Sequence, residues 1–95
     1  MSFEHLGRYY GIYMQSDVDR DGMALELMDE TERPHSLVLE VFYADADETM
    51  TLTAYREAIP LALIEMVVAK ARLKLPPAML VVSNISSPDF PGFQP

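Results

Sequence analysis

The residues of this chain with the clearest chemical potential lie at positions 17–22, where three aspartates stand at alternate positions and a glycine follows. This order matches the first half of an EF-hand calcium loop, in which oxygens at positions 1, 3 and 5 ligate the ion and a glycine makes the turn. The candidate ligands are Asp17, Asp19 and Asp21. The second half of the loop does not fit, because Met28 stands where the loop needs a bidentate glutamate.

The same six residues also have the composition of a hairpin turn. Residues 8–16, just before them, are rich in aromatic side chains, which indicates a strand and not the helix that an EF-hand requires. The Asp-Gly pair is a strong hairpin signal, because both residues tolerate a left-handed backbone. We therefore expect a hairpin turn at 16–22, with a calcium-responsive domain as an alternative function.

Residues that commonly perform catalysis do not form a recognisable motif. The chain has no cysteine, which excludes disulfides, thiolate catalysis and cysteine-ligated metals. Its two histidines, His5 and His35, lack metal-ligand spacing, and the sequence has neither a glycine-rich phosphate loop nor a nucleophile elbow. Glu40 lies between apolar strand residues, and we expect it to pair with Arg56 or Arg72. The expectation is a protein without catalytic activity and without a cofactor.

Negative charge is concentrated in the middle of the chain. Residues 17–57 contain twelve acids and three arginines, the remainder contains three acids and four bases, and the total is −8. An acidic surface repels nucleic-acid phosphates and attracts basic proteins. We expect a protein–protein interaction domain, of the kind found in bacterial-type inhibitor or immunity proteins, that binds a basic partner. The expected binding residues are Asp17, Asp19, Asp21, Asp29, Glu30, Asp45, Asp47 and Glu48.

The length of 95 residues suits a single domain over 1–95, with residues 1–7 and 87–95 expected as flexible ends. The longest apolar run, at 59–69, is too short and too interrupted to span a bilayer. Because the N-terminus has no signal-peptide pattern, the expected location is the cytoplasm, without membrane binding.

The hydrophobic pattern predicts an α+β fold, in which an antiparallel sheet of four to five strands packs against one long, largely buried helix. Strands are expected at about 9–15, 23–28, 36–43 and 49–55, with a further one at 78–82. The alternation in 49–55 predicts that its threonines face water and that Met50, Leu52 and Ala54 face the core. The helix is expected at about 58–74, followed by a Pro-rich C-terminal tail.

The predicted helix has two apolar stripes. The broader stripe is expected to face the sheet and contains Leu61, Ile64, Val68, Ala71 and Leu75. The narrower stripe contains Ala62, Met66, Ala69 and Leu73. Because a helix on the outside of a sheet needs only one apolar stripe, either the tail or a second subunit is expected to cover the narrower one. A homodimeric structural or regulatory module is therefore a further alternative function.

Overall fold

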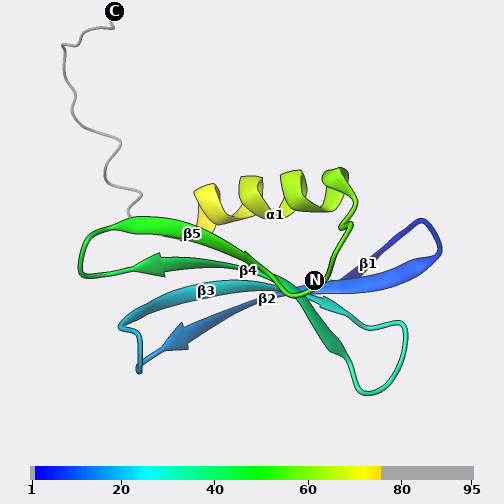
Figure 1. Ribbon diagram of the computed structural model, residues 1–95, viewed down its shortest axis with the longest axis horizontal. Helices are drawn as coiled ribbons and strands as arrows, with labels where there is room; N and C mark the ends of the chain where they lie inside the picture. The colour runs from blue at the N-terminus through cyan, green and yellow to red at the C-terminus, as the bar shows by residue number, and fades with distance from the viewer. Residues whose placement is uncertain (1, 76–95) are drawn as a thin grey trace, which may run out of the picture.

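A computed structural model describes residues 2–75 as one antiparallel sheet with a helix across one of its faces (Figure 1). This confirms the predicted α+β fold, an antiparallel sheet of four to five strands with one helix, and the number of strands is five. The elements are β1 (Ser2–His5), β2 (Arg8–Asp17), β3 (Gly22–Asp29), β4 (Ser36–Ala44), β5 (Thr49–Ala54) and α1 (Leu61–Lys74). The expected strand at 78–82 and the Pro-rich tail lie outside the described residues.

The strands follow one another in space in the order of the sequence, so the sheet is a simple meander. Its first strand, β1, is not predicted by the sequence. It pairs with β2 through a two-residue turn at Leu6 and Gly7, both with left-handed φ values of 51° and 82°. Phe3 stacks on Tyr10 with ring centroids 5.8 Å apart, which ties β1 to the edge of the core.

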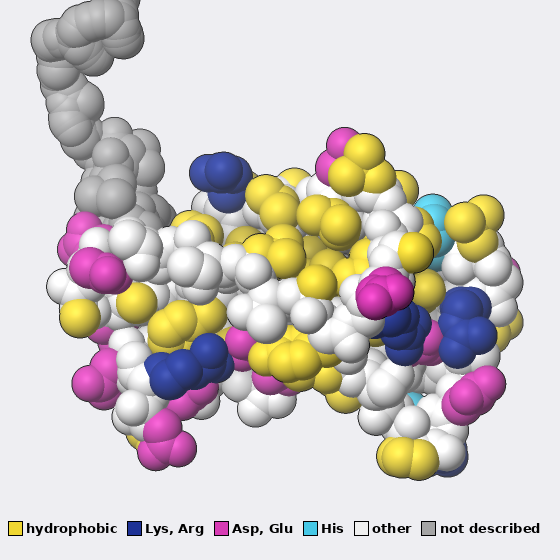
Figure 2. All heavy atoms as spheres, viewed as in Figure 1, with side chains coloured by type: hydrophobic (Ala, Val, Ile, Leu, Met, Phe, Trp, Pro, Cys, Tyr) yellow, Lys and Arg dark blue, Asp and Glu magenta, His cyan; other side chains and the backbone are white. Residues whose placement is uncertain are grey.

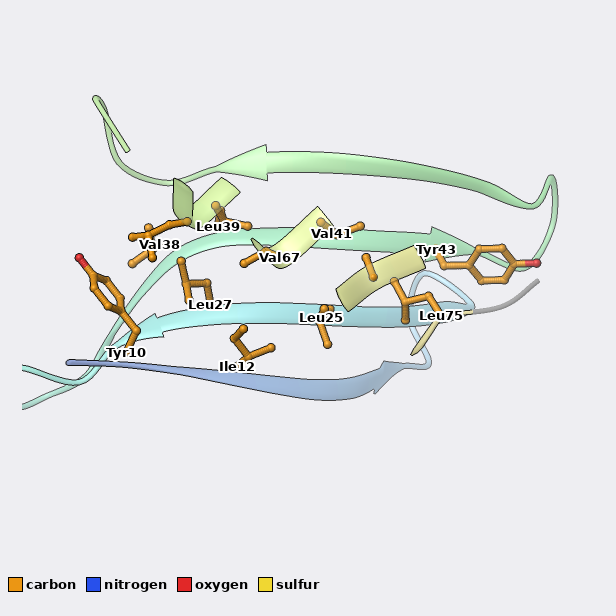
Figure 3. Close-up of a cluster of buried hydrophobic side chains, with 12 residues drawn as sticks. Tyr10, Ile12, Leu25, Leu27, Val38, Leu39, Val41, Tyr43, Val67 and Leu75 are labelled. Atoms are coloured by element: carbon orange, nitrogen blue, oxygen red, sulfur yellow. The ribbon is translucent and has the colours of Figure 1, made fainter. Parts of the chain in front are cut away.

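The core lies between α1 and the central strands (Figure 3). Leu27 and Leu39 are opposite each other on β3 and β4, both have no exposed surface, and α1 adds Leu63 and Val67 above the sheet. The remaining members of this cluster are Tyr10, Ile12, Leu25, Val38, Val41, Tyr43, Ala71 and Leu75. This core fixes the sheet and, with it, the positions of the hairpin turns.

The helix differs from the expected one in its start and in its buried face. Ala58 has a left-handed φ of 52° and Pro60 an extended backbone, so α1 cannot begin at 58 and begins at Leu61. The buried helix residues are Leu63, Val67 and Ala71, spaced four apart. Of the broader predicted stripe, Leu61 is 66% exposed. The described structure therefore does not show the largely buried helix that the sequence predicts, because only one side of α1 is covered.

A bulge in β4 changes which residues of that strand enter the core. Leu27 of β3 is opposite Leu39, whereas the next residue, Met28, is opposite Leu37. Val38 is therefore the extra residue of the bulge, and it joins the core. A strict alternation along β4 would place Val38 on the other face, together with Glu40 and Phe42.

The last strand, β5, is not covered by the helix. Met50 and Leu52 are opposite Tyr43 and Val41 and so face the helix side, as expected. They are nevertheless 36% and 41% exposed, because α1 packs over β3 and β4. The expectation that they enter the core is therefore wrong.

Gly22 begins β3 at a place where no side chain fits. A Cβ atom there would overlap the carbonyl oxygen of Tyr43 and lie 2.6 Å from Cζ of Phe42. Because a backbone oxygen cannot move without disturbing the β3–β4 ladder, we expect Gly22→Ala to lower the free energy of unfolding by about 2 kcal/mol. Urea denaturation measures this change.

Gly7→Ala is the matched control, since nothing lies within 4 Å of a Cβ at Gly7 and only its left-handed φ opposes the substitution. The expected cost is about 1 kcal/mol. Equal costs for the two variants would contradict the close packing assigned to Gly22.

Candidate functional site

The structure brings two acidic hairpin turns together at one end of the sheet. The turns at 18–21 and 45–48 connect neighbouring pairs of strands, and the amide of Asp45 donates a hydrogen bond of 3.0 Å to the carbonyl oxygen of Asp21. We call this region the acidic end. It contains Asp17, Asp19, Asp21, Asp45, Asp47 and Glu48. Acidic side chains gather there in Figure 2, at the end that carries the two turns in Figure 1.

Two of these acids shape the turns themselves. Asp17 Oδ1 accepts hydrogen bonds from the amides of Asp19 and Arg20, at 3.1 and 3.2 Å. Asp47 Oδ1 accepts from the amide and the hydroxyl of Thr49, at 3.2 and 2.8 Å. Such local bonds are typical of aspartate in turns. The carboxylates of Asp17 and Asp47 therefore stabilise the loops that present the other acids.

Arg20 connects the first turn to the face of the sheet opposite the helix. Its guanidinium lies 2.6 Å from Asp17 Oδ2 and 2.7 Å from Glu40 Oε2, and its Cζ is 4.0 Å from the ring centre of Phe42. Glu40 is buried, so this ion pair compensates a carboxylate that water scarcely reaches. The expected partners of Glu40, Arg56 and Arg72, are therefore wrong. The hydrogen bond from Arg20 lowers the pKa of Asp17, and the bond to Glu40 raises the pKa of Arg20.

This arrangement gives the calcium alternative no geometric support. Asp17, the first ligand of the predicted loop, is held by the guanidinium of Arg20. Among residues 2–75, no group of three or more acids and histidines is close enough to hold a metal ion. The turn expected at 16–22 accounts for the motif, because Asp21 takes a left-handed φ of 53° and Gly22 fits where a side chain would not.

Asp29 and Glu30, which the sequence grouped with the other acids, lie at the opposite end of the sheet. Asp29 is only 2% exposed, so the expectation that it is available to a partner is wrong. Its Oδ2 is 2.9 Å from Arg8 Nε and 3.0 Å from Arg56 Nη1, and its Oδ1 accepts the amide of Thr31 at 3.0 Å. Burial opposes ionisation, but the hydrogen bonds from Thr31, Arg56 and Arg8 outweigh it and hold the pKa of Asp29 well below its usual range.

Glu30 is partly enclosed by polar neighbours at the same end. It accepts hydrogen bonds from the hydroxyl of Tyr13 and from Ser2 Oγ, the latter at 3.2 Å, and His35 Nδ1 lies 4.0 Å away. The Tyr13 hydroxyl lowers the pKa of Glu30, and the same bond raises the pKa of Tyr13. Glu30 therefore fastens β1 and β2 to the start of the 30–35 loop. Of the eight predicted binding acids, the six at the acidic end are those that the structure brings together.

The narrower helix stripe lies on the outside of α1. Its four residues, Ala62, Met66, Ala69 and Leu73, are all exposed within the described part of the chain. Beside the helix, Lys70 and Lys74 line a shallow hollow of about 230 Å³ with Ile12, Met14 and Leu25. The sequence carries no separate signal for this hollow, because lysines near the C-terminal end of a helix are expected from the helix dipole alone.

No family model, curated protein or solved structure matches this chain. No helix within residues 2–75 is long and apolar enough to cross a membrane.

Proposed function

We propose that this chain is a non-catalytic protein–protein interaction domain of the inhibitor type, and that its acidic end binds a basic protein. The observation that supports this most strongly is the hydrogen bond between Asp45 and Asp21, because it joins the two acidic turns into one surface. Their carboxylates come from segments far apart in the sequence. A concentration of one sign of charge speeds the encounter with an oppositely charged partner and selects against acidic ones.

The acids of the acidic end differ in whether they bond to the turns, and this difference supports the same proposal. Asp17 and Asp47 hold the turns, whereas no hydrogen bond or ion pair within residues 2–75 engages the carboxylates of Asp19, Asp45 and Glu48. These three can therefore meet a partner without disturbing the fold. A rigid loop loses little entropy on binding, which favours affinity.

Charge reversal of these three acids tests the proposal. We expect the triple variant D19K/D45K/E48K to lose at least about tenfold in the capture of a basic protein from the cells that make this chain, since complementary charges become repulsive. Quantitative mass spectrometry compares what the tagged wild type and the tagged variant recover after cross-linking.

The matched control is E4K/E32K/E57K, which changes the net charge equally at exposed positions away from the acidic end. It should recover the same basic protein as the wild type. Equal recovery by the wild type and D19K/D45K/E48K would contradict the proposal, as would an equal loss in both triple variants.

A further inference from the structure

The exposed apolar stripe of α1, formed by Ala62, Met66, Ala69 and Leu73, does not belong to the acidic end. Leu73, in the last turn of α1, is 80% exposed, and Met66, in the middle of the helix, is 36% exposed. Figure 2 shows hydrophobic side chains on the surface along α1. We call these four residues the helix stripe.

The helix stripe is complementary in shape to a second copy of itself. Along the helix its residues alternate small, large, small and large. If two copies of α1 lie antiparallel about a two-fold axis, Ala62 is opposite the partner's Leu73, and Met66 is opposite the partner's Ala69. Each large side chain then meets a small one, which permits close packing of two helices. A parallel pairing in register would instead place Leu73 against Leu73.

The charges along one flank of the stripe fit the same arrangement. Glu65 and Arg72 are two turns apart on this flank, and both are exposed. With a two-fold axis perpendicular to both helices, the two copies of α1 run in opposite directions. The flank that carries Glu65 and Arg72 in one copy then lies beside the same flank of the other copy. Glu65 of one copy is then nearly level with Arg72 of the other, and the axis generates this ion pair twice. An isologous interface requires such self-complementarity.

The other flank carries Lys70 and Lys74. Both line the hollow with Ile12 and Met14 of β2, so they lie toward their own sheet. Because both lysines lie beside the stripe and not within it, the centre of the stripe contains only apolar residues.

We propose that the helix stripe binds a second copy of this chain, as a two-fold dimer in which the two α1 helices pack antiparallel. This inference is independent of the proposed function, because the two surfaces share no residue. The dimer would carry two acidic ends.

A pair of cysteines tests the register of the two helices. The chain has no cysteine of its own, and Ala62 and Leu73 are about 16 Å apart along one helix, too far for a bond within the chain. In the proposed dimer the two positions face each other across the interface. Under mild oxidation, A62C/L73C should therefore form covalent dimers at least about tenfold faster than A62C or L73C alone. Fast dimerisation of either single variant would overturn the antiparallel register.

The mass of the full chain in solution tests the interface itself. Light scattering at about 100 µM, a concentration suited to a small interface, should give twice the 10.7 kDa of one chain. L73E should return the mass to 10.7 kDa, whereas L61E, a similar change on an exposed residue outside the stripe, should not. E65R should weaken the dimer, because it places two positive charges opposite each other. E65R/R72E should restore the dimer, because positions 65 and 72 then carry opposite charges again in both ion pairs.

Other occupants of the stripe give different results, and each overturns the proposal. A monomer in which the thiol of L73C resists labelling would indicate that residues 76–95 cover the stripe. A monomer in which that thiol reacts freely would indicate that neither a second copy nor residues 76–95 cover the stripe, so that its partner would be a different protein. A dimer that L73E does not affect would use another surface.

Discussion

Leu27→Ala should lower the free energy of unfolding by about 3–5 kcal/mol. Leu27 has no exposed surface and lies opposite Leu39 at the centre of the core, beneath the helix (Figure 3). The substitution removes apolar contacts and leaves a cavity that the sheet cannot close, because the ladders to β2 and β4 fix the backbone on both sides. Urea denaturation followed by circular dichroism measures the loss.

Leu52→Ala is the matched control for this core substitution. Leu52 lies on the same side of the sheet but is 41% exposed, since the helix does not cover β5. The same chemical change should cost less than about 1 kcal/mol there. A similar cost at both positions would contradict the core as described.

Removing both arginines that pair with Asp29 should have the second largest effect. In R8M/R56M the buried carboxylate loses its two cations, and we expect a loss of about 3 kcal/mol at pH 7. The loss should not be larger, because the hydrogen bond from the Thr31 amide remains. Adding D29N to the double variant should recover part of the stability, since no buried charge is then left unpaired.

The effect of the two arginines should also depend on pH. The folded pKa of Asp29 lies below the unfolded value of about 3.9, so its contribution to stability is fully present above that value. This contribution decreases as the pH falls through the folded pKa. In R8M/R56M the pKa of Asp29 rises, so protonation at low pH relieves the unpaired charge. The stability difference between the wild type and R8M/R56M should therefore be smaller at pH 3 than at pH 7, and an equal difference would contradict the role of this ion pair.

The sequence predicts the elements well where their pattern is regular. The run at 36–43 is mostly apolar and includes valine, phenylalanine and tyrosine, which favour strands, and it forms β4. The helix ends at Lys74, which is the end that the sequence predicts. Short turns between successive strands favour a meander, which is the topology observed.

The errors arise where tertiary contacts override the local pattern. β1 is only four residues long and contains Glu4 and His5, so its sequence does not favour a strand, and pairing with β2 creates it. The bulge at Val38 shifts the phase of β4 by one residue, which no periodicity can indicate. The helix has apolar residues on most of its surface, and the sequence therefore could not select Leu63 and Val67 as the buried ones.

The candidate site shows the same limit. The acids of the turns at 18–21 and 45–48 could be listed from the sequence, and their common end follows from a meander. Asp29 could not be separated from them, because its burial depends on Arg8 and Arg56, which are distant in sequence. The pairing of Arg20 with Glu40 is similar, since Arg20 lies in the turn between β2 and β3 whereas Glu40 lies on β4.

The central claim is that the acidic end is the surface that binds a basic protein. The most direct measurement is a titration of the isotope-labelled chain with the basic protein recovered by the capture experiment, followed by the amide resonances of residues 2–75. We expect the largest shifts at residues 17–21 and 45–48, and we expect them to diminish as salt is added. Shifts centred on α1 or on β1, with the two turns unchanged, would contradict the claim.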